Sequence, residues 1–205
     1  MVHIVDSIVR AKVREFLNKH SLKLMRNTFI VLDIGCGKKP YKNYFKSCYY
    51  IGIDVSRDVE PDIVASAEAL PFRSEWFDVI LLTEVLEHVP EPTLVLSEAR
   101  KALKKGGFII ITAPQYWFLH EEPRDFYRFT KYGIEYLLKK TNFQIIDYEH
   151  KGGRVLLIGT QFLLALSKYF PRRIHHLLAL LFLSLDKKVF LPSDTLGWCF
   201  LAKKL

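Results

Sequence analysis

Short apolar runs alternate with longer mixed segments from residue 29 onwards. The runs fall at 29–34, 49–54, 62–65, 77–83, 107–113 and 143–149. Short β-branched or apolar runs that are bounded by glycine and polar residues are typical of buried parallel strands. Only about ten residues separate the second run from the third, so the helix between them should be nearly absent. The pattern predicts an α/β domain with a mostly parallel sheet.

Helices are predicted where apolar residues are spaced among charged ones. Residues 3–26 have this spacing, and one or two amphipathic helices are expected there. Pro92 fits the first turn of a helix that runs to about Lys105, where two glycines follow. Thr130 is expected to cap a helix that continues to about Lys140.

Residues 151–195 form an insertion before a predicted last strand at 196–203. Its apolar runs, Val155–Leu166 and Leu177–Leu185, are shorter than the ~18–20 residues that span a bilayer. A structureless connection of this length is unusual, so we predict two helices packed over the sheet edge or the active site. The predicted segments are N-terminal helices at 1–28, a core at 29–150, a helical insertion or lid at 151–195, and the last core strand at 196–205.

The stretch Asp33-Ile34-Gly35-Cys36-Gly37 directly follows the first apolar run, and Asp54 ends the second. A glycine-rich turn lets a ligand approach the backbone, and an acid at the next strand end can accept hydrogen bonds from a ribose. Pro40 stands where a dinucleotide fingerprint has its third glycine, and the sequence contains no P-loop. S-adenosylmethionine, a nucleoside without phosphates, is then the favoured ligand. A tight turn that binds nothing is the alternative.

The chain resembles class I S-adenosylmethionine-dependent methyltransferases, in particular the type 11 group. The matching stretches keep the family order and lie at 31–37, 51–54, 67–72, 76–80, 85–89 and 103–107. The resemblance covers about residues 29–150. It implies a Rossmann-like sheet of seven strands, mostly parallel, with a C-terminal antiparallel strand. In this chain the helical insertion precedes that strand.

The resemblance also implies which residues bind S-adenosylmethionine and release S-adenosylhomocysteine. Around the methionine part it places Asp33, Gly35, Cys36 and Gly37. Asp54 would hold the ribose hydroxyls and Val55 would lie against the adenine. The adenine edge would lie along Ser66, Ala67 and Glu68, and the transferred methyl would be bordered by Thr83 and Glu84.

The acceptor side is predicted at residues 120–130, which follow the fifth strand. This segment holds a histidine, three acids, two arginines and three aromatic residues. The candidate catalytic residues are His120 as the first choice of general base, His88 as the second, Asp125 and Tyr127. A loop held by salt bridges, with no catalytic role, is the alternative for the segment.

The net charge of +8 is concentrated in two places. Residues 10–26 hold six basic residues against one acid, and residues 151–190 hold seven against Asp186 alone. A solvated basic surface explains this, as would an acidic substrate, RNA or an anionic membrane. The three cysteines are scattered, which favours a reducing cytoplasm and predicts neither disulfides nor a metal site.

Three functions are compatible with these features. The first is methylation of a small molecule or of a glycan or lipid-linked acceptor, most simply at oxygen. The second is RNA methylation, which the long aliphatic runs beside the basic residues disfavour. The third is a non-catalytic subunit that binds a partner through the insertion. Residues 155–190 are expected to contact an anionic membrane peripherally or to form a homodimer interface.

Overall fold

The computed structural model describes residues 2–24, 28–166, 168–169, 171–191 and 194–205. Its centre is a seven-stranded sheet with the order β3-β2-β1-β4-β5-β7-β6. The strands are β1 (Ile30–Ile34), β2 (Tyr49–Asp54), β3 (Ile63–Val64), β4 (Phe77–Thr83), β5 (Leu103–Pro114), β6 (Phe143–His150) and β7 (Gly197–Lys204). β7 runs antiparallel to both of its neighbours, β5 and β6, and the other pairs are parallel. The predicted fold class is therefore confirmed.

Helices cover both faces of the sheet. They are α1 (Val2–Leu24), α2 (Pro92–Ala102), α3 (Lys131–Lys140), α4 (Arg154–Ala165) and α5 (Arg172–Lys188). Three short 3-10 turns complete the chain: η1 (Lys42–Phe45), η2 (Arg57–Val59) and η3 (Leu86–His88). The brief η2 is the only helical element described between β2 and β3, as their close spacing predicted. The prediction for 3–26 is resolved as one helix, with residues 25–26 lying outside the described residues.

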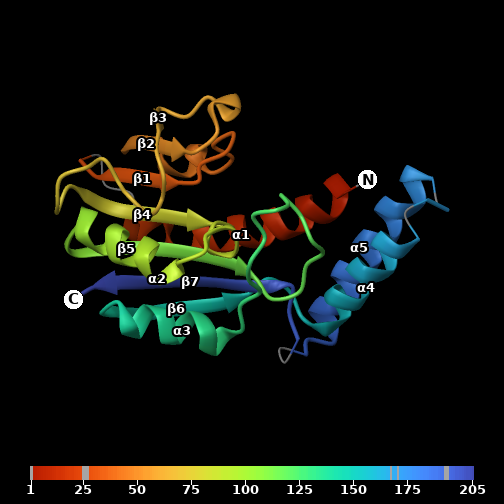
Figure 1. Cartoon of the computed structure of the whole chain (residues 1–205). Coiled ribbons are helices and arrows are strands. Elements are labelled where there is room, and N and C mark those ends of the chain that lie inside the picture. The colour runs from red at the N-terminus through yellow and green to blue at the C-terminus, as the bar shows by residue number, and fades with distance from the viewer. Residues whose placement is uncertain (1, 25–27, 167, 170, 192–193) are drawn as a thin grey trace.

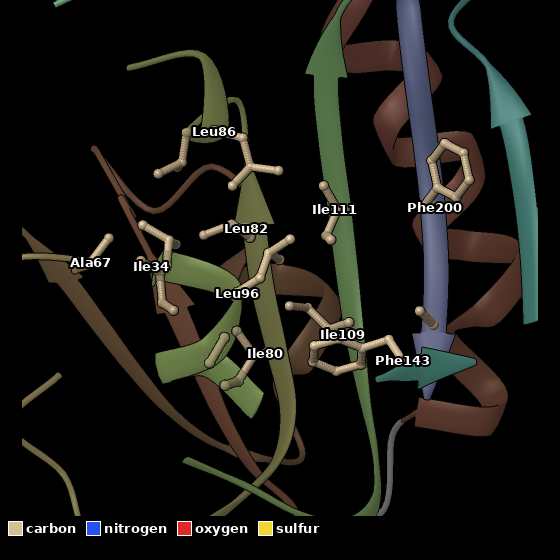
Figure 2. Close-up of a cluster of buried hydrophobic side chains, with 14 of the residues drawn as sticks. Ile34, Ala67, Ile80, Leu82, Leu86, Leu96, Ile109, Ile111, Phe143 and Phe200 are labelled. Carbon is tan, nitrogen blue, oxygen red and sulfur yellow. The ribbon is translucent and has the colours of Figure 1, made fainter. Parts of the chain in front are cut away.

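The main core lies between the sheet and α2 and α3. Leu82 of β4, Ile111 of β5 and Phe200 of β7 point to the same side as Leu96 of α2 (Figure 2). A second cluster fills the opposite face, where Phe16 of α1 and Phe45 of η1 are buried against the strands. Burial on both faces explains why the central strands are continuous apolar runs.

Two of the predicted boundaries are wrong, because tertiary pairing overrides the local signal. α2 ends at Ala102 rather than near Lys105, and β5 begins at Leu103 rather than at residue 107. Leu103 is fully buried and pairs with Phe77 before a register shift in the sheet. Lys104 donates to the Asp78 carboxylate at 2.8 and 2.9 Å. Thr130 caps α3 as predicted, since its Oγ1 accepts from Gly133 N at 3.1 Å.

The insertion forms a helical hairpin, α4 and α5, at the end of the sheet where the parallel strands finish (Figure 1). Asp186 of α5 accepts from the backbone N–H groups of Gly153 and Leu156 at 2.8 and 2.9 Å. Its carboxylate therefore caps the first turn of α4. Leu156 and Leu163 of α4 pack with Ile8 of α1, which ties the hairpin to the N-terminal helix. The two helices of the insertion are confirmed.

Candidate active site

A glycine turn joins β1 to the segment before η1. Gly35 and Gly37 have φ angles of +65° and +48°, a region that favours glycine. A Cβ on Gly35 would lie 2.5 Å from Cγ2 of Val85, so even alanine would clash there. The turn is thus compressed against the segment that follows β4, with its backbone open to the carboxyl end of the sheet.

Asp54 is held at the end of β2 by two backbone donors. Its Oδ2 accepts from Gly37 N at 3.0 Å and its Oδ1 from Ser56 N at 2.9 Å. Each carboxylate oxygen keeps a second lone pair, which can accept a hydrogen bond from a ligand. The glycine turn and the Asp54 carboxylate therefore form one pre-organised unit.

Two cavities open beside this unit at the carboxyl end of the sheet. The larger has a volume of about 810 Å³ and the smaller about 580 Å³. Both are lined by the same five residues: Gly35, Gly37, Glu84, His88 and Glu121. The cavities therefore adjoin, which gives room for two molecules whose reacting ends meet near Glu84 and His88.

The larger cavity contains most of the residues expected around a nucleoside. Its lining includes Asp54, Val55, Ser66, Ala67 and Glu68. Ser66 Oγ accepts from Glu68 N at 3.1 Å, which leaves the hydroxyl proton free to donate. This cavity combines a carboxylate with an apolar wall, as a ribose and an adenine ring require.

The smaller cavity is bordered by polar side chains and by Trp117. Cys36, Thr83, His120 and Lys151 line it. Burial raises the pKa of the Cys36 thiol to about 12, so this cysteine stays protonated and is a poor nucleophile. The chemistry of this cavity therefore falls to its histidines and acids.

Glu84 links the two cavities and has an unusual backbone. It follows β4 with φ at +54°, a left-handed conformation that side chains other than glycine adopt at a cost. Its Oε1 accepts hydrogen bonds from the Lys151 ammonium and the Thr112 hydroxyl. Lys151 is only 1% exposed, whereas the Glu84 side chain is 34% exposed, so a buried ammonium holds a carboxylate that is still open to the cavities.

His120 is oriented by its own loop. Its Nδ1 lies 3.1 Å from the Phe118 carbonyl oxygen and 3.3 Å from Oδ2 of Asp125. A carbonyl can only accept, so Nδ1 carries a proton, and in the neutral ring Nε2 keeps its lone pair. Asp125 also forms a two-pronged pair with Arg128, at 2.6 and 2.7 Å, which holds the pKa of Asp125 well below its usual range.

Known proteins match the central part of the chain. A family model described as a methyltransferase domain, of type 11, matches residues 32–111. A tRNA (carboxymethyluridine(34)-5-O)-methyltransferase of Arabidopsis thaliana is 31% identical over 104 residues, 45% of this chain and 25% of that protein. A mitochondrial ubiquinone biosynthesis O-methyltransferase of Candida albicans is 31% identical over 129 residues, 53% of this chain and 37% of that protein.

Solved structures agree on the fold. The phosphoethanolamine N-methyltransferase 2 of Haemonchus contortus, in complex with S-adenosylhomocysteine, superposes with a TM-score of 0.59 at 20% identity. The comparison covers 91% of this chain and 52% of that one. Residues 32–111 thus correspond to an S-adenosylmethionine-dependent methyltransferase domain. It spans about a quarter to a half of the length of the curated relatives that it matches.

Three of the candidate site residues do not line either cavity. Asp33 is buried behind the glycine turn, where its Oδ2 accepts from the Tyr50 hydroxyl. Asp125 supports His120 from behind, and the Tyr127 hydroxyl donates to the Pro90 carbonyl at 2.8 Å. Asp125 and Tyr127 are thus placed as supports for the loop of residues 120–130.

Several residues at the two cavities were not predicted from the sequence. Lys151 begins the insertion and reaches Glu84 across 67 positions of sequence. Val9 and Arg10 of α1 line the smaller cavity, although the N-terminal helix showed no signal of a site. These contacts depend on how distant elements pack, so no local sequence motif predicts them. Glu87 was not among the predicted site residues.

The burial of Asp33 predicts a pH dependence of stability. Burial raises the pKa of Asp33 to about 7, whereas an unfolded aspartate titrates near 3.9. The folded state therefore holds this proton more tightly, and stability falls as pH rises from about 4 to about 7. Between pH 5 and pH 8 the ligand-free wild type should lose about 2–3 kcal/mol more of its unfolding free energy than Asp33→Asn. Urea unfolding at both pH values measures this, and equal losses would contradict it.

Proposed function

We propose that this domain transfers the methyl group of S-adenosylmethionine to a hydroxyl oxygen of a small-molecule or glycan acceptor. The observation that carries the proposal is the junction of the two cavities. The larger cavity, which is lined by Asp54 and apolar side chains, meets a smaller cavity that is lined by His120. The nucleoside part of the cofactor would occupy the larger cavity, and its methionine part would extend into the smaller one. The acceptor would enter the smaller cavity beside His120.

Methyl transfer requires that the acceptor oxygen be aligned with the methyl group and that one base take the acceptor proton. The acceptor oxygen attacks the methyl carbon, the carbon–sulfur bond breaks, and its electron pair stays on sulfur to give S-adenosylhomocysteine. The acceptor proton passes to Nε2 of His120. Alignment of the two reactants supplies much of the acceleration, because the sulfonium is already a good leaving group. A positioned general base typically adds 10²–10⁴-fold.

Two relatives support oxygen as the acceptor atom. The Candida protein is named as an O-methyltransferase and the Arabidopsis protein as a 5-O-methyltransferase. The second name also supports a second candidate function, RNA methylation, together with the net charge of +8. We favour a smaller acceptor, because the basic residues of the insertion stand beside aliphatic side chains, which make a poor stacking platform for bases.

Extracts tested with isotope-labelled S-adenosylmethionine would decide between these functions. We expect the label to enter a low-molecular-weight or glycan fraction as an ether or ester, identified by mass spectrometry, and to survive treatment of the extract with ribonuclease. Loss of the labelled product after ribonuclease treatment would favour RNA. Absence of any labelled product across extracts, with S-adenosylhomocysteine still bound, would favour a non-catalytic role.

We further propose that the α4–α5 hairpin contacts an anionic membrane and gives access to a lipid-linked acceptor. The hairpin exposes large apolar side chains, namely Ile158, Phe162, Leu177, Leu180 and Leu181. Exposed basic residues stand on the same hairpin at Arg173, Lys187 and Lys188. No helix within the described ranges has the length and apolar character needed to cross a bilayer. This combination suits a peripheral contact.

Vesicle flotation tests the membrane proposal. The wild type should float with phosphatidylserine vesicles at low salt and be released at high salt, because screening weakens the attraction. Each basic residue near an anionic surface contributes about 1 kcal/mol. Lys187→Glu with Lys188→Glu should therefore reduce vesicle binding by at least roughly thirtyfold.

The matched control is Lys139→Glu with Lys140→Glu, two exposed lysines that likewise end a helix, α3, away from the hairpin (Figure 1). It should float like the wild type. If the wild type stays in solution at low salt and forms a stable dimer through α4 and α5, the partner of the hairpin is a second copy of the chain and the membrane proposal is wrong. Equal losses of vesicle binding in both double variants would show that net charge alone, and not the hairpin, causes the binding.

A further inference from the structure

Three side chains from two loops converge beside the smaller cavity, which His88 and His120 line. Glu87 and His88 belong to η3, which follows β4, and His120 belongs to the loop that follows β5. One ligand atom from each of them can be chosen so that all lie within 4.8 Å of one another. The ring centroids of the two histidines are 4.6 Å apart. We propose that these three residues bind one divalent transition-metal cation, such as Zn²⁺ or Mn²⁺.

The Glu87 carboxylate is the strongest indication of a missing cation. The residue is 0% exposed, and neither of its carboxylate oxygens accepts a hydrogen bond from another residue in the described part of the chain. The contact with His88 Nε2 is long, at 4.0 Å. A buried carboxylate without partners is costly, and a coordinated cation removes that cost.

Both histidines are oriented as metal ligands usually are. His88 Nδ1 lies 2.6 Å from the Arg124 carbonyl oxygen, and His120 Nδ1 lies 3.1 Å from the Phe118 carbonyl oxygen. Each ring must donate through Nδ1, so the Nε2 lone pair is left for a cation. Metal-binding histidines commonly donate their other ring N–H to a carbonyl, which fixes the tautomer and the ring plane.

The cluster is held together by the backbone. The N–H groups of Phe126 and Tyr127 donate to the Glu87 carbonyl oxygen at 2.8 and 3.3 Å. These bonds tie the loop that carries His120 to the turn that carries Glu87 and His88. Ligand atoms around one cation lie about 3–4 Å apart when each is ~2.1 Å from it. A contraction of about 1 Å would close the cluster on a metal.

The donor set selects the kind of cation. Two imidazoles and one carboxylate suit Zn²⁺, Mn²⁺ and similar ions, whereas Mg²⁺ and Ca²⁺ prefer oxygen ligands. Glu121, whose Oε2 lies 3.9 Å from His88 Nε2, stands beside the site but is 73% exposed, so we leave it outside the ligand set. The remaining positions would be open to water or to the acceptor, as at catalytic metal sites.

The role that we give the metal in catalysis rests on the proposed function, but metal binding itself can be tested without it. A coordinated hydroxyl has a lowered pKa, so the acceptor could lose its proton to solvent. His120 would then serve as a ligand rather than as the base. The earlier prediction that the chain has no metal site considered cysteine spacing alone, and this cluster contains no cysteine.

Metal binding can be measured without cofactor or acceptor. The chelator-treated, tag-free chain should bind one equivalent of Zn²⁺ by calorimetry, and Co²⁺ should give a visible absorption band that Zn²⁺ removes. Glu87→Gln and His120→Ala should each weaken Zn²⁺ binding at least tenfold. Millimolar Mg²⁺ should not displace Zn²⁺. His176→Ala, which removes an exposed histidine of α5, should bind like the wild type.

No stoichiometric Zn²⁺ binding, equal affinity in the wild type and both cluster variants, or displacement by Mg²⁺ would overturn the inference. Circular dichroism checks that each variant is folded, and His88→Ala replaces any that is not. The two proposals can fail separately. Zn²⁺ bound at this cluster with no methyl transfer would refute the function alone, whereas methyl transfer by a chain that binds no metal would refute the metal site alone.

Discussion

Replacing His120 by alanine should lower kcat by about 10²–10⁴-fold and leave the affinity for S-adenosylhomocysteine nearly unchanged. The expected loss is large because we propose that Nε2 of His120 takes the acceptor proton or holds a cation. The cofactor should bind as before, since we place its ribose and adenine in the other cavity. Single-turnover kinetics with the acceptor and calorimetry with S-adenosylhomocysteine measure the two effects.

The control for this experiment is His176→Ala, which changes an exposed histidine on α5. Its turnover should equal that of the wild type. A His120→Ala enzyme with normal turnover would remove this residue from the mechanism and leave the 120–130 loop with a structural role. A loss of cofactor affinity equal to the loss of turnover would indicate that the variant disturbs the larger cavity as well.

Replacing Asp54 by alanine should weaken binding of S-adenosylhomocysteine at least tenfold. A carboxylate that accepts two ribose hydrogen bonds contributes about 1.5–3 kcal/mol for each. The side chain is already aimed by Gly37 N and Ser56 N, so little order has to be gained on binding. Calorimetry with the purified variant measures the change.

Asp58→Ala is the matched control, since Asp58 is an exposed acid four residues further along the same loop. Its affinity for S-adenosylhomocysteine should be that of the wild type. Undiminished binding by Asp54→Ala would contradict the placement of the ribose. Tighter binding of NAD than of S-adenosylhomocysteine by the wild type would contradict the choice of cofactor.

The fold was predictable because its central strands are buried on both faces. Val31 and Leu32 in β1 and Ile80 and Leu81 in β4 are fully buried, so each strand is a continuous apolar run. The closeness of the glycine turn to Asp54 was also predictable, because they lie on neighbouring strands whose carboxyl ends share one edge of the sheet.

The smaller cavity was predictable only in part. The polar residues after a strand predicted a site at His120, but the closeness of His120 to Glu87 and His88 depends on backbone bonds between two loops. The ion pair of Glu84 with Lys151 joins a strand end to the start of the insertion. The early start of β5 likewise follows from its pairing with Phe77. Such contacts are set by packing, which leaves no periodic signal in the sequence.

A crystal structure of the chain with S-adenosylhomocysteine tests the central claim most directly. We predict that the ribose hydroxyls bind Asp54, that the methionine part lies along Gly35 and Gly37, and that the sulfur faces the side of the smaller cavity that holds His88 and His120. A ligand whose ribose lies away from Asp54, or whose sulfur faces away from both histidines, would contradict the account.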